Sequence, residues 1–415
     1  MWKHKNILFA TGILVLLVLV GGIWFFFFHN STLPSSLNIS GLFGQPANNT
    51  NSSSGSTTTT VPNNQTLIEN GTSAVSKIFE ISNGPVTSAT FIQTSNPTTT
   101  LARFMTQQDG HVFDLPINVS GAVLRPVSDI TIPGTQRALW VQGGSAVVLQ
   151  YLDNQTIKTV YEGFPKTVSA TSSAGTSRVQ FLPDNILDIA ASPDGTQVAY
   201  ILKNNSGGVN GYIALADGSV PKNIFSIPLT QLLITWPAPT TLLLQTKSAA
   251  DTEGVIFAVG TKSGIVLPLV DGAGITAIAN KDLSEIIYQT RLSGESYTHI
   301  HQLATGNDIR LPTDPIPEKC IWGSIATTML YCANPISYVS AGYLDFWHQG
   351  TASTADNIFA FSIPAGSSVV VAAPGSTEDG GSPADIAGLA ISLDNNYLLY
   401  VTKGGRSLWG VRLTQ

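Results

Sequence analysis

The chain has 415 residues, of which 43% are hydrophobic and 11% are charged, and its formal net charge is −6. A chain of this length suits two or three domains or one large repeat fold, because a single ordinary core does not grow to this size. Nucleic-acid binding needs clustered Lys and Arg that neutralise phosphates, and this composition excludes nucleic acid as an expected partner.

The N-terminus carries an uncharged apolar run from Ile7 to Phe28, preceded by Lys3 and Lys5. A helix over this run would be about 33 Å long, which suffices to cross a hydrocarbon core of about 30 Å. The run is longer than the apolar region of a signal peptide, and no Ala-x-Ala cleavage site follows it. Since Lys residues before a span favour the cytoplasmic side, we expect residues 1–6 inside, a signal anchor over 7–28 and the remainder outside the cell membrane.

Residues 29–75 contain "ANNTNSSSGSTTTTVPNNQT" and are dominated by Ser, Thr, Asn and Gly. Such a segment has too little apolar surface to offset the entropy lost on ordering. We expect a flexible linker that spans roughly 35–40 Å as a random coil.

From residue 76 onward, short apolar runs bounded by Gly, Pro, Asp and Asn predict strands and turns, and no stretch keeps a helical period long enough to predict a helix. One run recurs with an aromatic or large apolar centre, and four of the six spacings between centres lie near 40 residues. Four strands repeated at this period predict an all-β fold, a β-propeller over residues 76–415. The predicted centres, each expected in the second strand of its unit, are Phe104, Trp140, Tyr200, Leu244, Tyr288, Tyr331 and Tyr400.

The stretch "ASPDGTQVAYI", with weaker copies at 277–289 and 390–401, resembles the repeat of WD-repeat-like propellers of bacterial envelopes. These include the Tol-system periplasmic propeller and peptidase-associated propellers. The resemblance implies a propeller over residues 76–415 and carries no catalytic residues with it, since a fold does not fix a function.

The repeat predicts seven blades, with six as the alternative if one weak unit is an insertion. The last unit supplies only three strands before the sequence stops at Gln415. The segment "SKIFEIS" at 76–82 has strand character and could close the ring as the fourth strand, which would leave no open sheet edge.

Two long insertions interrupt the repeat. One, near 163–185, is expected between the outer strand of one blade and the inner strand of the next, and the other, near 334–356, between the second and third strands of a blade. In an antiparallel four-stranded meander these two connections emerge on the same face. The linker would then join the opposite face, so that the insertions point away from the membrane.

The second insertion, which contains "SYVSAGYLDFWHQG", is the predicted binding site. Loops on a rigid scaffold often carry function, and Tyr and Trp dominate binding hot spots. The alternative is that these aromatic side chains fold back and cap the neighbouring blade. The candidate binding residues are Tyr338, Tyr343, Asp345, Phe346, Trp347 and His348.

The two cysteines, Cys320 and Cys332, flank a segment centred on Ala326, and a hairpin turning there would set them opposite one another. Either a disulfide or two buried thiols fits this arrangement. His299 and His301 share one face of a predicted strand, but two ligands do not make a metal site. We expect no metal, no cofactor and no catalytic motif.

The sequence therefore predicts a membrane-anchored extracytoplasmic propeller that binds a protein or an envelope glycan. The alternative is a cell-surface hydrolase or lyase with carboxylates at the axial pocket, for which Asp345 and Asp356 are the acidic candidates on the insertion-bearing face. The low charge content favours the binding module.

Overall fold

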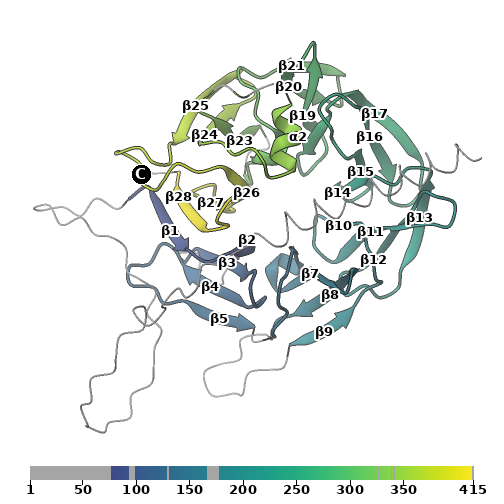
Figure 1. The fold of residues 1–415 in the computed structure, drawn as a ribbon, viewed down its shortest axis with the longest axis horizontal. Helices are drawn as coiled ribbons and strands as arrows, with labels where there is room; N and C mark the ends of the chain where they lie inside the picture. The colour runs from purple at the N-terminus through teal and green to yellow at the C-terminus, as the bar shows by residue number, and fades with distance from the viewer. Residues whose placement is uncertain are drawn as a thin grey trace, which may run out of the picture. The chain divides into compact units, whose positions relative to one another are not determined.

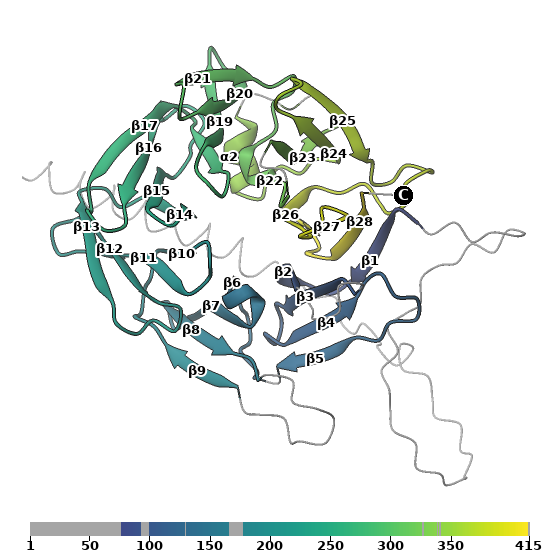
Figure 2. The same cartoon turned by 180° about the vertical axis from the view of Figure 1, so that it is seen from behind.

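The structure, a computed structural model, describes residues 76–92, 99–128, 130–165, 177–325, 328–337, 339 and 342–413. Within these residues the strands form seven antiparallel four-stranded sheets, arranged as blades around a ring (Figures 1 and 2). The seven-bladed β-propeller predicted from the repeat is confirmed, and the six-bladed alternative is wrong. The predicted membrane span 7–28 and linker 29–75 lie outside the described residues, and no described helix is long and apolar enough to cross a membrane.

The blades are numbered in chain order. Blade 1 consists of β2 (Val86–Ile92), β3 (Leu101–Thr106), β4 (Val112–Pro116) and β5 (Arg125–Ser128). Blade 2 consists of β6 (Arg137–Val141), β7 (Ala146–Asp153), β8 (Thr156–Gly163) and β9 (Arg178–Phe181). Blade 3 consists of β10 (Asp188–Ala191), β11 (Gln197–Lys203), β12 (Val209–Leu215) and β13 (Lys222–Ile227). Blades 4 and 5 consist of β14 (Leu232–Ala238), β15 (Thr241–Thr246), β16 (Glu253–Gly260) and β17 (Val266–Ala273); and β18 (Thr276–Ala279), β19 (Glu285–Leu292), β20 (Glu295–Gln302) and β21 (Asn307–Arg310). Blades 6 and 7 consist of β22 (Cys320–Trp322), β23 (Met329–Pro335), β24 (Asp356–Ser362) and β25 (Ser367–Ala372); and β26 (Ile386–Ile391), β27 (Tyr397–Thr402), β28 (Leu408–Arg412) and β1 (Ile78–Ser82).

The core lies between neighbouring blades rather than inside any one of them. One apolar cluster joins Ala199 and Ile201 of blade 3 to Leu232, Ile234 and Leu244 of blade 4. In blades 3, 4 and 7 the second strand is covered on both faces, which is why its apolar residues run almost without interruption.

The ring is closed by the first strand and the last blade. β1 pairs with β28, with Ile78 opposite Val411, so the purple and yellow strands lie side by side in Figure 1. The prediction that residues 76–82 supply the fourth strand of the last blade is confirmed. Because strand directions alternate, β1 begins on the face that carries the turns between first and second and between third and fourth strands. We call this the N-terminal face and the opposite one the insertion face.

Every pair of adjacent blades is also joined by a polar side chain that bonds to the backbone of the neighbouring blade or of the chain leading into it. Gln150, Gln245 and Gln289 occupy the same place in the second strands of three blades. Gln150 and Gln289 donate to a backbone carbonyl oxygen, and Gln245 accepts from a backbone N–H. In ring order from blade 1 the seven bonds are Arg103 Nη1 to Gly144 O at 2.7 Å, Gln150 Nε2 to Ile186 O at 3.2 Å, Ile234 N to Asp188 Oδ2 at 2.6 Å, Ala277 N to Gln245 Oε1 at 2.9 Å, Gln289 Nε2 to Pro315 O at 3.2 Å, Ile386 N to Asp356 Oδ2 at 2.8 Å, and Arg406 Nη2 to Thr87 O at 3.1 Å.

Two predictions about blade 2 are wrong. Trp140 lies in the inner strand β6, and the second strand is β7, because a tight turn over Gln142–Gly144 brings two apolar strands close together in sequence. The insertion near 163–185 separates β8 from β9 within the blade, so it leaves from the N-terminal face instead of the insertion face. The reason is that β9 is a strand of only four residues, all of them exposed, so it gives a weak sequence signal.

The second insertion lies where it was predicted, between β23 and β24. It contains a six-residue helix, α2 (Tyr343–His348), which the sequence did not predict because the helix is shorter than two turns. A 3-10 turn, η3 (Pro317–Lys319), precedes β22.

Candidate functional site

Helix α2 divides the predicted binding residues into a buried and an exposed group. Tyr343 and Trp347 are 9% and 7% exposed, and with Leu344 and Ile316 they form a small apolar cluster. Phe346 is 48% exposed. Side chains four positions apart share one helix face, which explains why Tyr343 and Trp347 turn inward together.

The burial of Tyr343 and Trp347 matches the alternative in which the aromatic side chains fold back on the ring. Phe346 is the aromatic side chain of α2 that faces solvent, and His348 is exposed beside it. Tyr338, the remaining predicted residue, lies outside the described residues.

Lys319, at the end of η3, is the centre of a buried charge network beneath α2. Its side chain is 0% exposed, and Nζ lies 2.8 Å from Asp356 Oδ2 and 2.6 Å from Asp385 Oδ1. Nζ also donates a hydrogen bond to Thr354 Oγ1 at 3.1 Å. Burial by itself lowers the pKa of Lys319, but the attraction of Asp356 and the hydrogen bonds outweigh it and raise the pKa. The ammonium group therefore stays charged.

Trp347 connects the helix to this network and to blade 7. Its Nε1 donates to Asp385 Oδ1 at 3.1 Å, and the ammonium of Lys403 lies 3.7 Å from the centre of its ring. Lys403 also donates to the carbonyl oxygen of Trp347. Burial lowers the pKa of Lys403. Trp347 is thus fixed by a hydrogen bond at its edge and a cation over its face.

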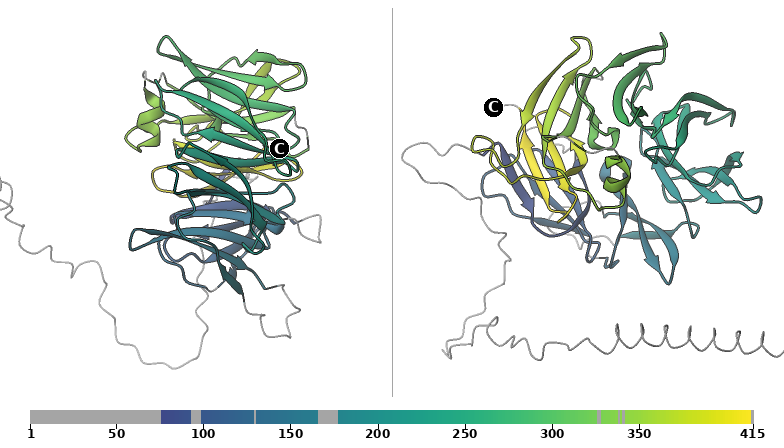
Figure 3. Two further views of the ribbon diagram at one scale, coloured as in Figure 1. Left: turned by 90° about the vertical axis from the view of Figure 1, so that its right-hand side faces the viewer. Right: turned by 45° about the horizontal axis from the view of Figure 1, so that its top comes forward.

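The other polar residues of α2 reach neighbouring blades. Asp345 Oδ1 accepts a hydrogen bond of 2.7 Å from the backbone N–H of Ala250, in the turn between β15 and β16 of blade 4. His348 Nε2 lies 3.3 Å from Glu318 Oε1. In Figures 1 and 2 α2 lies toward the centre of the ring, and in the side view of Figure 3 it stands out from one face. The helix is therefore held by blades 4, 6 and 7 at the axial end of the insertion face.

The insertion encloses a hollow of about 330 Å³ between α2 and its own flanking arms. The hydroxyl of Tyr343 lies 3.1 Å from Thr354 Oγ1, so one wall of the hollow is continuous with the Lys319 network. The hollow is lined by Ser337, Val339, Tyr343, Ala352, Ser353, Thr354 and Ala355.

Lys319, Asp385 and Lys403 were not predicted as site residues from the sequence. They come from three separate connections, 66 and 18 residues apart along the chain. Each is a single charge without a motif around it. Their one sequence signal is rarity, because charged residues make up only 11% of the chain.

The structure also tests the acidic pair that the enzyme hypothesis requires. Asp356 and Asp385 meet at the same ammonium group, but they are only 1% and 4% exposed, and Asp385 also accepts a hydrogen bond from Trp347. Asp345 is bound to the Ala250 backbone. Among the described residues no group of three or more His, Cys, Asp or Glu side chains is arranged to hold a metal ion.

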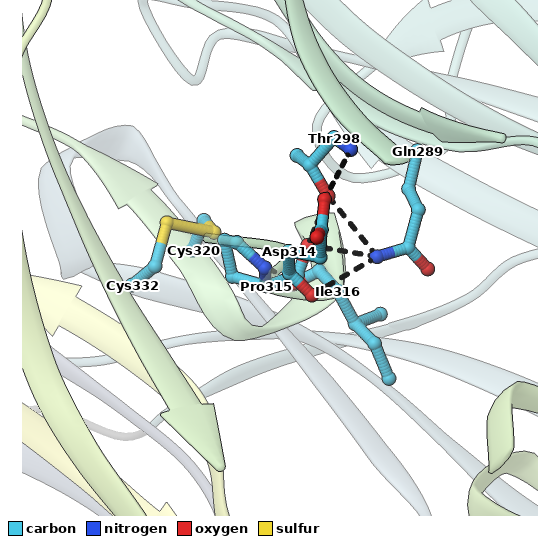
Figure 4. The surroundings of a disulfide bond; sticks show 7 residues. All are labelled: Gln289, Thr298, Asp314, Pro315, Ile316, Cys320 and Cys332. Atoms are coloured by element: carbon cyan, nitrogen blue, oxygen red, sulfur yellow. Dashed lines mark hydrogen bonds between the residues drawn. A yellow bond between two sulfur atoms is a disulfide. The ribbon is translucent and has the colours of Figure 1, made fainter. Parts of the chain in front are cut away.

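Cys320 follows Lys319 directly and lies opposite Cys332 in the register of β22 and β23, as the hairpin prediction required. The two cysteines are joined by a disulfide, with Cα atoms 4.0 Å apart (Figure 4). Beside it, Gln289 Nε2 donates to Pro315 O at 3.2 Å and to Thr298 Oγ1 at 3.1 Å. Both ends of the chain leading to Lys319 are therefore fixed, one by blade 5 and one by the disulfide.

No family model matches this chain, and no curated protein matches its sequence. Among solved structures, it is similar to an oligogalacturonate lyase in complex with manganese, at 11% identity and a TM-score of 0.52, over 82% of this chain and 99% of the other. It is also similar to the Pan2 WD40 domain of Neurospora crassa, at 10% identity and a TM-score of 0.48 over 82% and 99%, and to the tricorn protease, at 10% and 0.47 over 83% and 34%. At such identities the likeness shows the fold alone. The chain is a seven-bladed β-propeller, and the likeness to the lyase structure agrees with this fold.

Proposed function

We propose that the protein is a membrane-anchored extracytoplasmic propeller that binds a protein or an envelope glycan through its insertion face. The apolar run at 7–28 and the polar linker at 29–75 support the anchorage. The resemblance of the Ser-Pro-Asp-Gly repeat to Tol-system envelope propellers supports the location.

The observation that carries the binding role is the contrast within α2. The Lys319 network and Trp347 hold the helix from below, while Phe346 stays 48% exposed and Ile336, at the start of the insertion, 59% exposed. A pre-ordered aromatic side chain loses little entropy when a partner covers it.

The test places a photo-crosslinking amino acid at position 346 of the full-length protein in its native cell. The matched control carries the same amino acid at position 152, since Leu152 is 63% exposed at the insertion-face turn of blade 2. We expect a discrete protein or glycan adduct at 346 that is absent at 152. The same adducts at both positions, or none at 346, would contradict the proposed site.

A second arm uses substitutions that leave the buried network intact. Phe346→Ala should weaken capture of the partner at least tenfold, while Leu292→Ala, which changes another exposed apolar residue of the insertion face, should leave it unchanged. Trp347→Ala is unsuitable here because it removes packing and the bond to Asp385 as well.

The alternative hydrolase or lyase is not better supported. It requires carboxylates that reach a substrate, whereas Asp356 and Asp385 are buried and bound to Lys319. The oligogalacturonate lyase has a similar fold, but its activity is a property of that protein and not of this chain.

A further inference from the structure

The N-terminal face of the propeller presents apolar side chains at the tips of its turns. They lie in the turns of blades 1, 3, 4, 6 and 7, between first and second or between third and fourth strands. An exposed apolar residue alone needs no explanation, but a set on one face indicates a contact surface. The six residues, with their exposed fractions, are Val119 (50%), Val123 (64%), Val220 (76%), Ile265 (60%), Ile325 (69%) and Leu393 (53%).

Val220 is the clearest member of this set. It lies in the turn between β12 and β13 with φ at +54°, a conformation that is an outlier for a β-branched residue. Its side chain packs against little, since it is 76% exposed. A glycine or asparagine would fit this turn with less strain, so the fold does not explain the valine.

Positive charges accompany the apolar tips. Arg125 lies two residues after Val123, Lys222 two residues after Val220, and Lys262 three residues before Ile265. These three side chains are exposed, and none belongs to an ion pair found among the described residues.

On the insertion face, two exposed apolar residues have acidic neighbours. There the exposed Leu152 is followed by Asp153, and the exposed Leu292 is followed three residues later by Glu295. On the N-terminal face the exposed Asp394 also follows Leu393, so the three exposed cations lie beside the tips of blades 1, 3 and 4. Apolar side chains interleaved with Lys and Arg are the combination that binds the interface of an anionic lipid bilayer.

The place where the chain joins the propeller identifies the occupant of this surface. β1 begins on the N-terminal face, and the predicted anchor and its linker precede it in sequence. A linker of this length holds the propeller at an effective concentration on the order of millimolar next to the bilayer, so weak contacts suffice.

We propose that the N-terminal face docks on the anionic lipid bilayer that holds the anchor, with the apolar tips in the headgroup region and Arg125, Lys222 and Lys262 beside lipid phosphates. This inference rests on the membrane anchorage of the proposed function. It deepens that proposal, because docking turns the insertion face and Phe346 outward, toward a partner.

The test uses the full-length protein in vesicles that contain anionic lipid and a nitroxide-labelled lipid. The only two cysteines of the chain form the Cys320–Cys332 disulfide, so a single new cysteine can carry a fluorophore under non-reducing conditions. Labels at Val220→Cys and Ile265→Cys report on the N-terminal face, and labels at Leu152→Cys and Leu292→Cys are controls of similar exposure on the insertion face.

We expect the lipid to quench the labels at 220 and 265 at least threefold more than those at 152 and 292. Lys222→Glu with Lys262→Glu should abolish the difference, and Lys203→Glu with Lys247→Glu, on the insertion face, should preserve it. Equal quenching of all four labels in a chain that floats with the vesicles overturns the docking and leaves the anchorage standing. A chain that does not float overturns the anchorage and the docking with it.

Discussion

Lys319 determines the position of the insertion through a single ammonium group. It is the one cation that bonds to both Asp356 of blade 6 and Asp385 on the way into blade 7 within the described network. Two carboxylates without a cation at this depth would repel each other in a medium that screens poorly. Lys319 therefore stabilises both the contact between blades 6 and 7 and the position of α2.

We expect Lys319→Met to lower the free energy of unfolding by about 3–5 kcal/mol, because it leaves buried carboxylates without their partner. Chemical denaturation monitored by tryptophan fluorescence measures this change. The control is Lys158→Met, which removes the exposed ion pair with Asp184 and should leave the denaturation midpoint close to its original value. Equal effects of both substitutions would show that the network is not structural.

A second residue-scale feature is an aspartate that recurs in the turn between first and second strands. Asp194 accepts hydrogen bonds from Ser192 and Thr196, and the bond from Ser192 is the largest cause that lowers its pKa. Ser284 lowers the pKa of Asp282 in the same way. Burial opposes the shift at Asp394, where the bonds from Ser392 and Asn396 still lower the pKa.

Because these pKa values are lower in the folded protein, their stabilising effect is present above the unfolded value near 3.9 and is lost as the pH falls through the folded values. We expect the triple variant Asp194→Asn, Asp282→Asn, Asp394→Asn to unfold more easily at pH 7 and to depend less on pH between about 5 and 2. Unfolding measured over this range checks the slope. An unchanged slope would mean that other carboxylates control acid unfolding.

At the scale of elements, the turn Ser192–Thr196 shows why the repeat copy in blade 3 needs a glycine at position 195. Gly195 has φ at +69°, and a Cβ there would lie 2.5 Å from the backbone nitrogen of Gln142 in blade 2. The carbonyl of Gly195 also accepts a hydrogen bond from that nitrogen. Leu283 and Asn395 hold the same left-handed conformation in blades 5 and 7.

We therefore expect Gly195→Ala to destabilise the protein by more than about 2 kcal/mol, since strain and a clash between blades add. Gly207→Ala is the matched control, because Gly207 also has a positive φ but no atom within 4 Å of its would-be Cβ, and it should cost only about 1–2 kcal/mol. Thermal unfolding of both variants gives the comparison. Equal losses would show that the contact with Gln142 adds nothing.

At the scale of the whole molecule, stability depends on ring closure by β1. Ile78 and Ile81 are 1% and 4% exposed, and β1 covers the edge of β28. Without β1, the backbone groups of that edge would be open to pairing with another chain.

We expect a chain that starts at Gly84 to lose the burial of both isoleucines, about 1.5–3 kcal/mol each, and to form oligomers. A chain that starts at Ser76 keeps β1 and should stay monomeric and unfold cooperatively. Light scattering and denaturation of the two truncated proteins distinguish these outcomes. A monomeric, equally stable chain from Gly84 would contradict closure as the source of stability.

The sequence alone determined the class of fold, the closure by residues 76–82 and the position of the second insertion, and it favoured seven blades over six. These features follow from local sequence patterns, because strand runs, turn residues and a repeat period near 44 residues can be read directly from the sequence. Blade 2 was predicted wrongly because β9 has only four residues, all exposed, and because Trp140 lies in a strand that resembles the next one in sequence.

Only the tertiary structure decided what the aromatic insertion does. Phe346 faces solvent, whereas the neighbouring Trp347 lies under Lys403 and against Asp385. The sequence could not distinguish the two residues, because the direction of a short helix decides which side chain is buried. Lys319, Asp385 and Lys403 are scattered in sequence and meet only when blades 6 and 7 pack against each other. Their attraction acts over a few ångströms in space, a distance that no local sequence pattern encodes.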